Sequence, residues 1–233
     1  MTVLLTRPEA QSHETATLLA ADGVTSLIWP LTRINPVDAP RDTPAGTTAL
    51  LFTSANAVRA WAALSLERQL PALCVGPRTA KTAAEAGWDA EAAGGCAEAL
   101  ADLVRSRGHR FLFHPRGRHV AGDLASGLGA SGILLVERVV YEAVETGGPT
   151  PEIDAALACG KVRVLSAWSP RGAEILARAM ADRPDWPAAR MRLVAISAAA
   201  AAPLRVSGLR AVQIAEIPDG RAMCAAILLA ARG

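Results

Sequence analysis

The sequence predicts an α/β protein built from two similar units, each with a parallel β-sheet covered by helices. Three observations lead to this fold class. Short apolar runs alternate along the chain with Ala-rich stretches of helical period, which is typical of β-α-β crossovers. A small polar turn stands between most of these runs and the helices that follow them. Three of the turns recur in the same order later in the chain, which indicates an internal repeat.

The first strand and helix show the pattern most clearly. Val3–Leu5 is a short apolar run, and Glu9–Ala21 has helical period with Gly23 as its stop. Thr6 and Glu9 have the spacing of a capping box, in which the Thr side chain accepts a hydrogen bond at the helix N-terminus. We therefore expect Thr6 to cap the first helix.

The same alternation continues to the end of the chain, interrupted by two loose segments rich in Pro and Gly, 35–47 and Glu145–Pro151. Apolar runs predict strands at Val24–Trp29, Ala49–Phe52, Ala72–Val75, Arg110–Phe113, Ile133–Tyr141, Val162–Ala167, Arg192–Ile196 and Ala211–Ala215. Stretches of helical period predict helices at Ala55–Leu66, Pro77–Ala86, Ala97–Arg107, His119–Leu128, Glu152–Ala158, Pro170–Ala181 and Gly220–Ala231, with a broken helix at Ala198–Val206.

The repeated turns predict how the units divide the chain. The corresponding pairs are Arg7 and Arg116, Ser54 and Ser169, and Gly76 and Ser197, at spacings of 109, 115 and 121 residues. The loose segments do not fall at the midpoint of the chain, so one unit must be discontinuous. We predict one lobe from residues 1–34 plus 144–233 and another from 38–138, with extended crossings at about 31–37 and 139–144.

Composition narrows the class of protein. With 233 residues, 51% hydrophobic and 20% charged, the chain is globular rather than disordered. A net charge of +2 provides no overall field for nucleic acid. The N-terminus lacks a signal peptide, and no apolar stretch approaches the ~20 residues of a membrane span. The four cysteines are scattered and form no C-x-x-C pair, which favours buried thiols in the cytoplasm.

The strand–turn–helix junctions are the best functional lead. A helix N-terminus has free backbone N–H groups, which bind anions, and several of these turns also carry an Arg. The pattern predicts a ligand with negative charge at several points. The junctions are Thr6–Glu9, Thr53–Asn56, Gly76–Thr79, His114–Gly117 and Ser169–Gly172, with Ser197 as a weaker sixth.

Each of these features also has a simpler interpretation. Only Lys81 and Lys161 of the 24 basic residues are lysine, so the arginines can reflect genome composition. Thr6, Ser54 and Ser169 can serve only as N-caps. Tyr141, the single tyrosine, can be an aromatic residue at the rim of a unit.

Other functional motifs are weak or absent. Gly127–Gly132 matches G-x-G-x-x-G, but it follows a predicted helix and precedes a strand, which is the wrong context for a dinucleotide. His114 and His119 have a spacing that could bind a metal but lack a third ligand, so we interpret them as polar rim residues near an anion. No P-loop and no nucleophile elbow are present.

Four motifs in order resemble the uroporphyrinogen-III synthase family: Thr-Arg-Pro at 6–8, Phe-Thr-Ser-x-Asn-Ala-Val at 52–58, Val-Gly-Pro-Arg-Thr-Ala at 75–80 and Val-Val-Tyr-Glu at 139–142. The resemblance covers nearly the whole chain. It implies two similar flavodoxin-like parallel-sheet lobes joined by a two-stranded crossing, with the site in the interlobe cleft. It also implies a monomer with no cofactor, no metal, and no nucleic-acid or membrane partner.

The resemblance further implies an activity and a set of site residues. Such an enzyme, a cyclising hydro-lyase, closes hydroxymethylbilane to uroporphyrinogen III with loss of water and inversion of ring D, a step toward haem and related tetrapyrroles. This substrate is a polycarboxylate, which agrees with the anion-binding junctions. Tyr141 corresponds to the family's cleft tyrosine, proposed to assist departure of the hydroxyl, and Thr79 to a threonine of its Gly-Pro-x-Thr motif. With the junction arginines, the expected substrate-binding residues are Thr6, Arg7, Thr53, Ser54, Asn56, Gly76, Arg78, Arg116, Ser169, Arg171 and Ser197.

One motif departs from the family pattern. Ser197–Ala201 lacks the Gly, Pro and Thr residues of the family's second Gly-Pro-Thr-Thr-Ala motif, so hydroxyl contacts beyond Ser197 are lost there. The alternative function from another class is a non-catalytic two-lobed polyanion-binding or sensor protein built on the same junctions.

Overall fold

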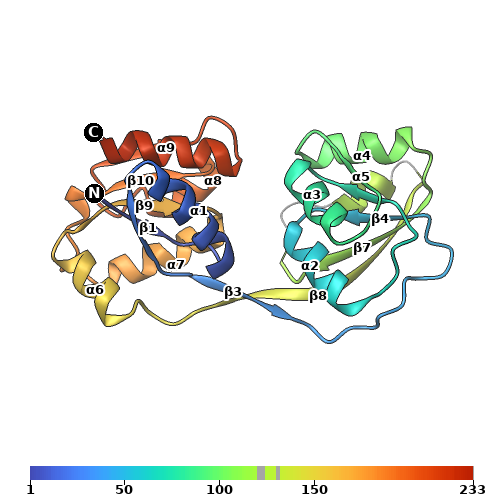
Figure 1. The fold of residues 1–233 in the computed structure, drawn as a ribbon, viewed down its shortest axis with the longest axis horizontal. Coiled ribbons are helices and arrows are strands. Elements are labelled where there is room, and N and C mark those ends of the chain that lie inside the picture. Colours follow the sequence, from blue (N-terminus) through green and yellow to red (C-terminus); the bar gives the residue numbers. More distant parts are fainter. Residues whose placement is uncertain (120–123, 130–131, 233) are drawn as a thin grey trace. The chain divides into compact units, whose positions relative to one another are not determined.

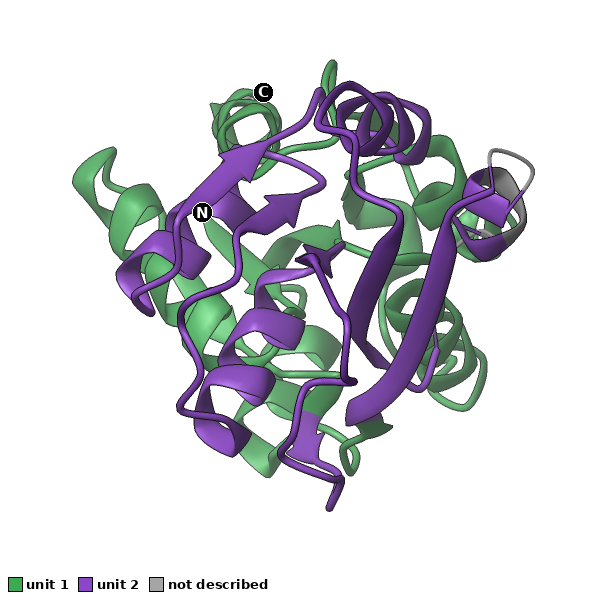
Figure 2. Cartoon of the chain, turned by 90° about the vertical axis from the view of Figure 1, so that its right-hand side faces the viewer, with its two compact units in different colours: residues 1–33, 144–233 green, residues 34–143 purple. Residues whose placement is uncertain are grey.

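The computed structural model describes residues 1–119, 124–129 and 132–232, and it confirms the α/β class with two parallel-dominated sheets (Figure 1). The chain divides into two compact units. Unit 1 contains residues 1–33 and 144–233, and unit 2 contains residues 34–143 (Figure 2). The chain therefore passes between the units twice, near residues 33 and 144.

Unit 1 has a five-stranded sheet in the order β11-β10-β9-β1-β2, and all its strand pairs are parallel. Numbered within the unit, this is the order 2-1-3-4-5 of flavodoxin-like folds. The strands are β1 Thr2–Leu5, β2 Thr25–Ile28, β9 Val162–Ala167, β10 Arg192–Ala195 and β11 Ala211–Ile214. The helices are α1 Glu9–Ala21, α6 Pro151–Ala158, α7 Pro170–Ala181, α8 Ala198–Ala201 and α9 Gly220–Arg232, with 3₁₀ turns η1 Ala188–Arg190 and η2 Ala202–Leu204.

Unit 2 contains most of a six-stranded sheet in the order β3-β8-β7-β4-β5-β6. The strands are β3 Thr32–Pro36, β4 Ala49–Phe52, β5 Ala72–Cys74, β6 Ala90–Ala92, β7 Phe111–Gly117 and β8 Leu134–Glu145. The helices are α2 Ala55–Leu64, α3 Pro77–Glu85, α4 Ala97–Ser106 and α5 Leu124–Gly129. β3 and β8 contain the two points at which the chain changes unit, and they are neighbours in this sheet.

Burial on both faces explains why the central strands are continuous apolar runs. Val3 and Leu5 of β1 belong to one hydrophobic cluster of unit 1, and Leu4 belongs to the other. Because successive side chains point to opposite faces of a sheet, these two clusters lie on its two sides. In unit 2, Trp61 of α2 packs on Phe113 of β7 with ring centroids 5.0 Å apart.

The two sheets share one topology. Starting from β2 and from β8, their orders are β2-β1-β9-β10-β11 and β8-β7-β4-β5-β6. β1 thus matches β7, β9 matches β4 and β10 matches β5. These are the pairs of elements that carry the recurring motifs of the sequence, so the prediction of two similar units is confirmed.

The structure corrects the fourth predicted junction. His114–Gly117 is the second half of β7, not a turn. β7 pairs with β8 as far as Gly117 and Tyr141, whereas its pairing with β4 ends at Phe113. Pro115, which has no N–H to donate, is therefore tolerated in the part of β7 that extends beyond β4.

Other expectations were also wrong in detail. β6 was not expected, and β8 is longer than predicted. The predicted helix at 119–128 falls partly outside the described residues, and so does the 127–132 glycine motif; within the described part, α5 ends at Gly129. Cys74 is buried as expected, but Cys96 and Cys159 are exposed. Among the described residues, no helix has the length and apolar character needed to span a membrane.

Candidate active site

The carboxyl ends of parallel strands form the edge of an α/β sheet at which ligands bind. In unit 2 this edge receives the loops after β4 and β5 and the far end of β7. The expected site residues Thr53, Ser54, Gly76 and Thr79 all belong to these loops or to the helix turns that follow them. The topology therefore brings together residues that are separated in the sequence.

Ser54 connects the start of α2 to Tyr141. Its hydroxyl accepts a hydrogen bond from the backbone N–H of Asn56 at 3.1 Å, so it caps the helix as predicted. The same oxygen lies 3.4 Å from the Tyr141 hydroxyl, which donates to it. Tyr141 comes from β8, two strands away from β4. This contact holds the phenol over the N-terminus of a ten-residue helix.

Gly117 makes room for the Tyr141 ring. A Cβ atom added at Gly117 would lie 2.7 Å from Cζ and 2.9 Å from the hydroxyl oxygen of Tyr141. Real carbon atoms do not approach so closely, so any side chain here would displace the tyrosine. Residue 117 must be glycine because there is no room for a side chain; the backbone conformation does not require it, since φ is not positive.

A chain of polar side chains crosses three neighbouring strands. Thr53 Oγ1 lies 3.2 Å from Nε2 of His114, and Nδ1 of the same ring lies 3.1 Å from Glu137 Oε1. His114 is only 2% exposed, so our interpretation of it as a rim residue was wrong. Burial is the main cause that lowers the pKa of His114; the hydrogen bond to Glu137 opposes this, and Arg116 adds to it.

The basic residues at the end of β7 are already paired. Arg116 Nε lies 3.1 Å from Glu137 Oε2, and Arg116 Nη1 donates to the carbonyl oxygen of Gly117 at 3.0 Å. Arg118 Nε donates to Glu142 at 2.8 Å. The charge of Arg116 is therefore partly neutralised by Glu137.

The start of α3 offers backbone N–H donors. The N-cap residue is Gly76, which has no side chain to accept a hydrogen bond from them, and Pro77 occupies the first turn. The N–H groups of this turn are therefore available to an anion. Arg78 beside them is exposed, whereas Thr79 is 6% exposed.

At the matching edge of unit 1, hydroxyl side chains donate hydrogen bonds to backbone carbonyl oxygens. Thr6 donates to the carbonyl oxygen of Ser166 at 2.5 Å, and Ser166 donates to that of Leu4 at 2.8 Å. Thr6 does not cap α1, whose N-cap is Pro8, so the capping-box prediction was wrong. The Arg7 guanidinium lies 4.3 Å from the ring centroid of Trp168.

The remaining unit 1 candidates lie at the starts of α7 and α8. Ser169 caps α7 by accepting from the N–H of Gly172 at 3.1 Å, as predicted. Ser197 caps the four-residue α8 through Ala200 at 3.2 Å. Arg171 Nη1 is buried and has no hydrogen-bond partner among the described residues.

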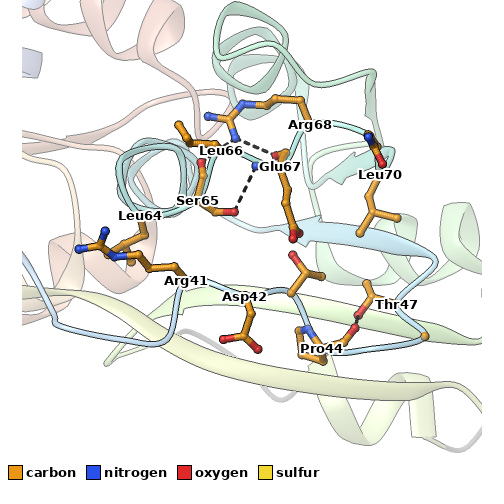
Figure 3. A pocket seen from close by; sticks show the side chains of 13 residues that line it. Arg41, Asp42, Pro44, Thr47, Leu64, Ser65, Leu66, Glu67, Arg68 and Leu70 are labelled. Carbon is orange, nitrogen blue, oxygen red and sulfur yellow. Dashed lines mark hydrogen bonds between the residues drawn. The ribbon is translucent and has the colours of Figure 1, made fainter.

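A large groove lies at the other edge of the unit 2 sheet. It has a volume of about 1040 Å³ and is lined by segments 41–47 and 64–70, which precede β4 and β5 (Figure 3). Leu66 there is 94% exposed, and Arg68 is fixed by backbone carbonyls, among them that of Glu67 at 2.7 Å. None of the expected site residues lines this groove. Its place at the amino ends of the strands makes it a poor candidate for the active site.

No group of three His, Cys, Asp or Glu residues capable of holding a metal occurs within the described ranges. Both ring nitrogens of His114 have protein partners, and His119 is exposed. The candidate site consists of hydroxyl groups, arginines, one buried imidazole and backbone amides.

The model of the family described as "Uroporphyrinogen-III synthase HemD" matches residues 13–225. The chain belongs to the uroporphyrinogen-III synthase family. A uroporphyrinogen-III synthetase from Helicobacter pylori is similar in structure, at 20% identity and a TM-score of 0.65, with 99% of each chain covered. A mutant uroporphyrinogen III synthase from Thermus thermophilus is similar at 20% identity and a TM-score of 0.59, with 100% of this chain and 99% of that chain covered. A search of curated proteins found no match.

The sequence did not predict the positions of three residues at this edge of the synthase. Glu137 was not singled out, Gly117 was assigned to a turn, and His114 was assigned to the rim. The His114–Glu137 contact follows from the register of β7 on β8, in which the two residues are direct partners. A strand prediction extended past Pro115 would have found this pair, but nothing local indicates that Gly117 lies under Tyr141.

Proposed function

We propose that the carboxyl-end edges of both sheets bind one molecule of the family's substrate, hydroxymethylbilane. The reaction follows from family membership, which rests on the match over residues 13–225. The enzyme, a hydro-lyase, closes the linear tetrapyrrole to uroporphyrinogen III, with loss of water and inversion of ring D. This is a step in haem and tetrapyrrole biosynthesis.

Tyr141 is the proposed proton donor to the departing hydroxyl. Support comes from its position, since its phenol lies beside Ser54 at the N-terminus of α2. A general acid must reach the leaving group at hydrogen-bond distance. The hydrogen bond to Ser54 is long, at 3.4 Å, and the single phenol proton would turn from Ser54 to the departing hydroxyl when substrate binds. Thr79, in the first turn of α3, is the second proposed catalytic residue.

The substrate carboxylates are proposed to bind at helix N-termini and arginines. α2, α3 and α7 supply backbone N–H groups, and Arg7, Arg78, Arg116 and Arg171 supply charge. Arg171 supports this best, because its buried Nη1 lacks a protein partner within the described residues. Such contacts restrain a flexible linear substrate near its closed form.

We also propose a cytoplasmic monomer that works without a cofactor, as the family resemblance implies. The cysteines support the location: all four lie in the described residues, and none of them forms a disulfide.

The test is an assay with freshly prepared hydroxymethylbilane, followed by chromatography of the oxidised products. We expect the type III isomer. Only the type I isomer, the product of spontaneous closure, would overturn the proposed activity. Tyr141→Phe should lower kcat by about 10²–10⁴-fold if the phenol is the general acid. Glu67→Gln, in the groove at the opposite edge, is the matched control and should leave the rate unchanged.

A further inference from the structure

The buried imidazole of His114 lies between two side chains that come from the strands on either side of β7. Thr53, directly after β4, lies 3.2 Å from Nε2, and Glu137 of β8 lies 3.1 Å from Nδ1. The His114 side chain is 3% exposed, and that of Glu137 is 31% exposed. Thr53 is an expected substrate contact of this edge, and its hydrogen-bond partner is a buried titratable ring. The way in which His114 orients the Thr53 hydroxyl therefore affects which ligand group Thr53 can bind.

The hydrogen-bond inventory fixes where the protons are. A carboxylate only accepts, so the Nδ1–H of His114 donates to Glu137. The pKa of His114 is lowered, first by burial and also by Arg116, which outweighs the hydrogen bond to Glu137. The ring is therefore neutral near pH 7, and its bare Nε2 accepts the proton of the Thr53 hydroxyl. Because its proton is used in this hydrogen bond, Oγ1 of Thr53 can only accept a hydrogen bond from a ligand.

A hydroxyl oxygen held in this way selects its partner by chemistry. It repels a carboxylate, which is also an acceptor, and it attracts an N–H donor. A linear tetrapyrrole has both kinds of group, carboxylates on its side chains and N–H groups on its pyrrole rings. We propose that His114 orients the Thr53 hydroxyl as an acceptor for a pyrrole N–H of the substrate. This inference rests on the proposed function and gives Thr53 a ring contact in place of a carboxylate contact, with His114 as a positioning residue.

The chain contains its own control for this arrangement. His109 Nδ1 lies 3.2 Å from Thr48 Oγ1, at the amino-end edge of the same sheet. That pair is exposed, and the Thr48 hydroxyl donates to the carbonyl oxygen of Phe111 at 2.9 Å. It combines the same two residue types at the amino ends of the same two strands, β4 and β7, away from the candidate site.

The kinetic test compares the two pairs. Thr53→Val and His114→Phe should each raise KM for hydroxymethylbilane about tenfold with little change in kcat, since a contact to an unreacting N–H binds substrate and transition state alike. The double variant should be no worse than either single variant, because His114 acts through Thr53. Thr53→Ser and His114→Gln, which keep the hydroxyl and an acceptor for its proton, should stay near wild type, as should Thr48→Val and His109→Phe.

The spectroscopic test examines the ring directly. In ¹⁵N-labelled enzyme at pH 7.5, the His114 signals should be those of a neutral ring protonated on Nδ1. They can be assigned by their absence in His114→Gln, because the chain has only four histidines. A charged ring, or a proton on Nε2, would overturn the inference.

The outcomes separate this inference from the proposed function. If the wild type yields only the type I isomer, the proposed function fails. If it yields type III but Thr53→Val keeps its KM, or if the two single effects add, the function stands and the inference is wrong. Should His114→Phe fail to fold, Thr53→Val and the ring signals still decide.

Discussion

The two matching sheet edges use their polar side chains in different ways. In unit 1, hydroxyls at the ends of β1 and β9 donate to backbone carbonyls, from Thr6 to Ser166 and from Ser166 to Leu4. In unit 2, the carboxyl ends of the equivalent strands β7 and β4 are linked beyond their backbone pairing by a contact between two side chains, His114 and Thr53. A hydroxyl bound to the backbone is part of the fold. A hydroxyl bound to a side chain can be set for a ligand, so the same topology uses the Thr6 hydroxyl for the fold and leaves the Thr53 hydroxyl for the ligand contact proposed above.

Gly117→Ala should have the largest effect on activity. The new methyl group would meet Tyr141 at 2.7 Å and force the ring away from Ser54. We expect kcat to fall by at least the ~10²-fold assigned to a lost general acid, with some loss of stability from overpacking. Steady-state kinetics measure the first effect and thermal unfolding the second.

Gly148→Ala, where nothing lies within 4 Å of the added atom, is its control. By the correspondence of Arg7 with Arg116, unit 1 has Pro8 in place of Gly117. An unchanged kcat in Gly117→Ala would show that this difference between the edges has no catalytic meaning.

Thr6→Val tests the hydroxyl that is bound to the backbone in unit 1. It removes the donor to the Ser166 carbonyl oxygen inside unit 1, where Thr6 is 6% exposed. The free energy of unfolding should fall by about 1–3 kcal/mol, because a buried acceptor loses its partner. KM should change less than in Thr53→Val. Denaturant titration and kinetics on both variants make the comparison, and a larger change in KM for Thr6→Val would reverse our assignment of the two hydroxyls.

Ser169→Ala should lower stability by about 1 kcal/mol, the usual effect of losing an N-cap. Ser197→Ala, the matching change at the four-residue α8, should have a smaller effect because there is less helix to stabilise. Both are measured as shifts of the denaturation midpoint. Equal shifts would mean that α8 depends on its cap as much as the twelve-residue α7 does.

The smallest effect concerns pH. Since burial lowers the pKa of His114 below its ordinary value of 6.5, the unfolded chain takes up this proton before the folded one does. Stability from the neutral ring is thus fully present above about pH 6.5 and is lost as the pH falls from there to the pKa of the folded state. The wild type should lose more stability than His114→Gln on acidification over this range. Parallel losses in urea titrations from pH 7.5 to 5.5 would contradict it.

Much of the fold was predictable because buried parallel strands and proline-started helices leave strong local signals. The predicted bounds of Glu9–Ala21, Ala49–Phe52, Val162–Ala167 and Pro170–Ala181 agree with the structure. β6 was missed because Ala-Glu-Ala has little strand character, and the end of β7 was missed because Pro115 read as a turn.

The candidate site was less accessible to sequence reasoning. The caps Ser54 and Ser169 were predicted from residue type and position alone. Thr6 has the same residue type and spacing, but the N-cap of α1 is Pro8, and the Thr6 hydroxyl donates to the carbonyl oxygen of Ser166 instead. The contact between Thr53, His114 and Glu137 depends on the register of three strands, which no local pattern encodes.

The double passage of the chain between units has a consequence for folding during synthesis. Unit 2 is one continuous stretch, residues 34–143, and can form as soon as it leaves the ribosome. β1 must wait for its neighbour β9, since Val3 pairs with Val164. β1 can pair with β2, which is made soon after it, but its other edge stays unpaired until most of the polypeptide has been made. That apolar edge therefore needs protection from aggregation during synthesis.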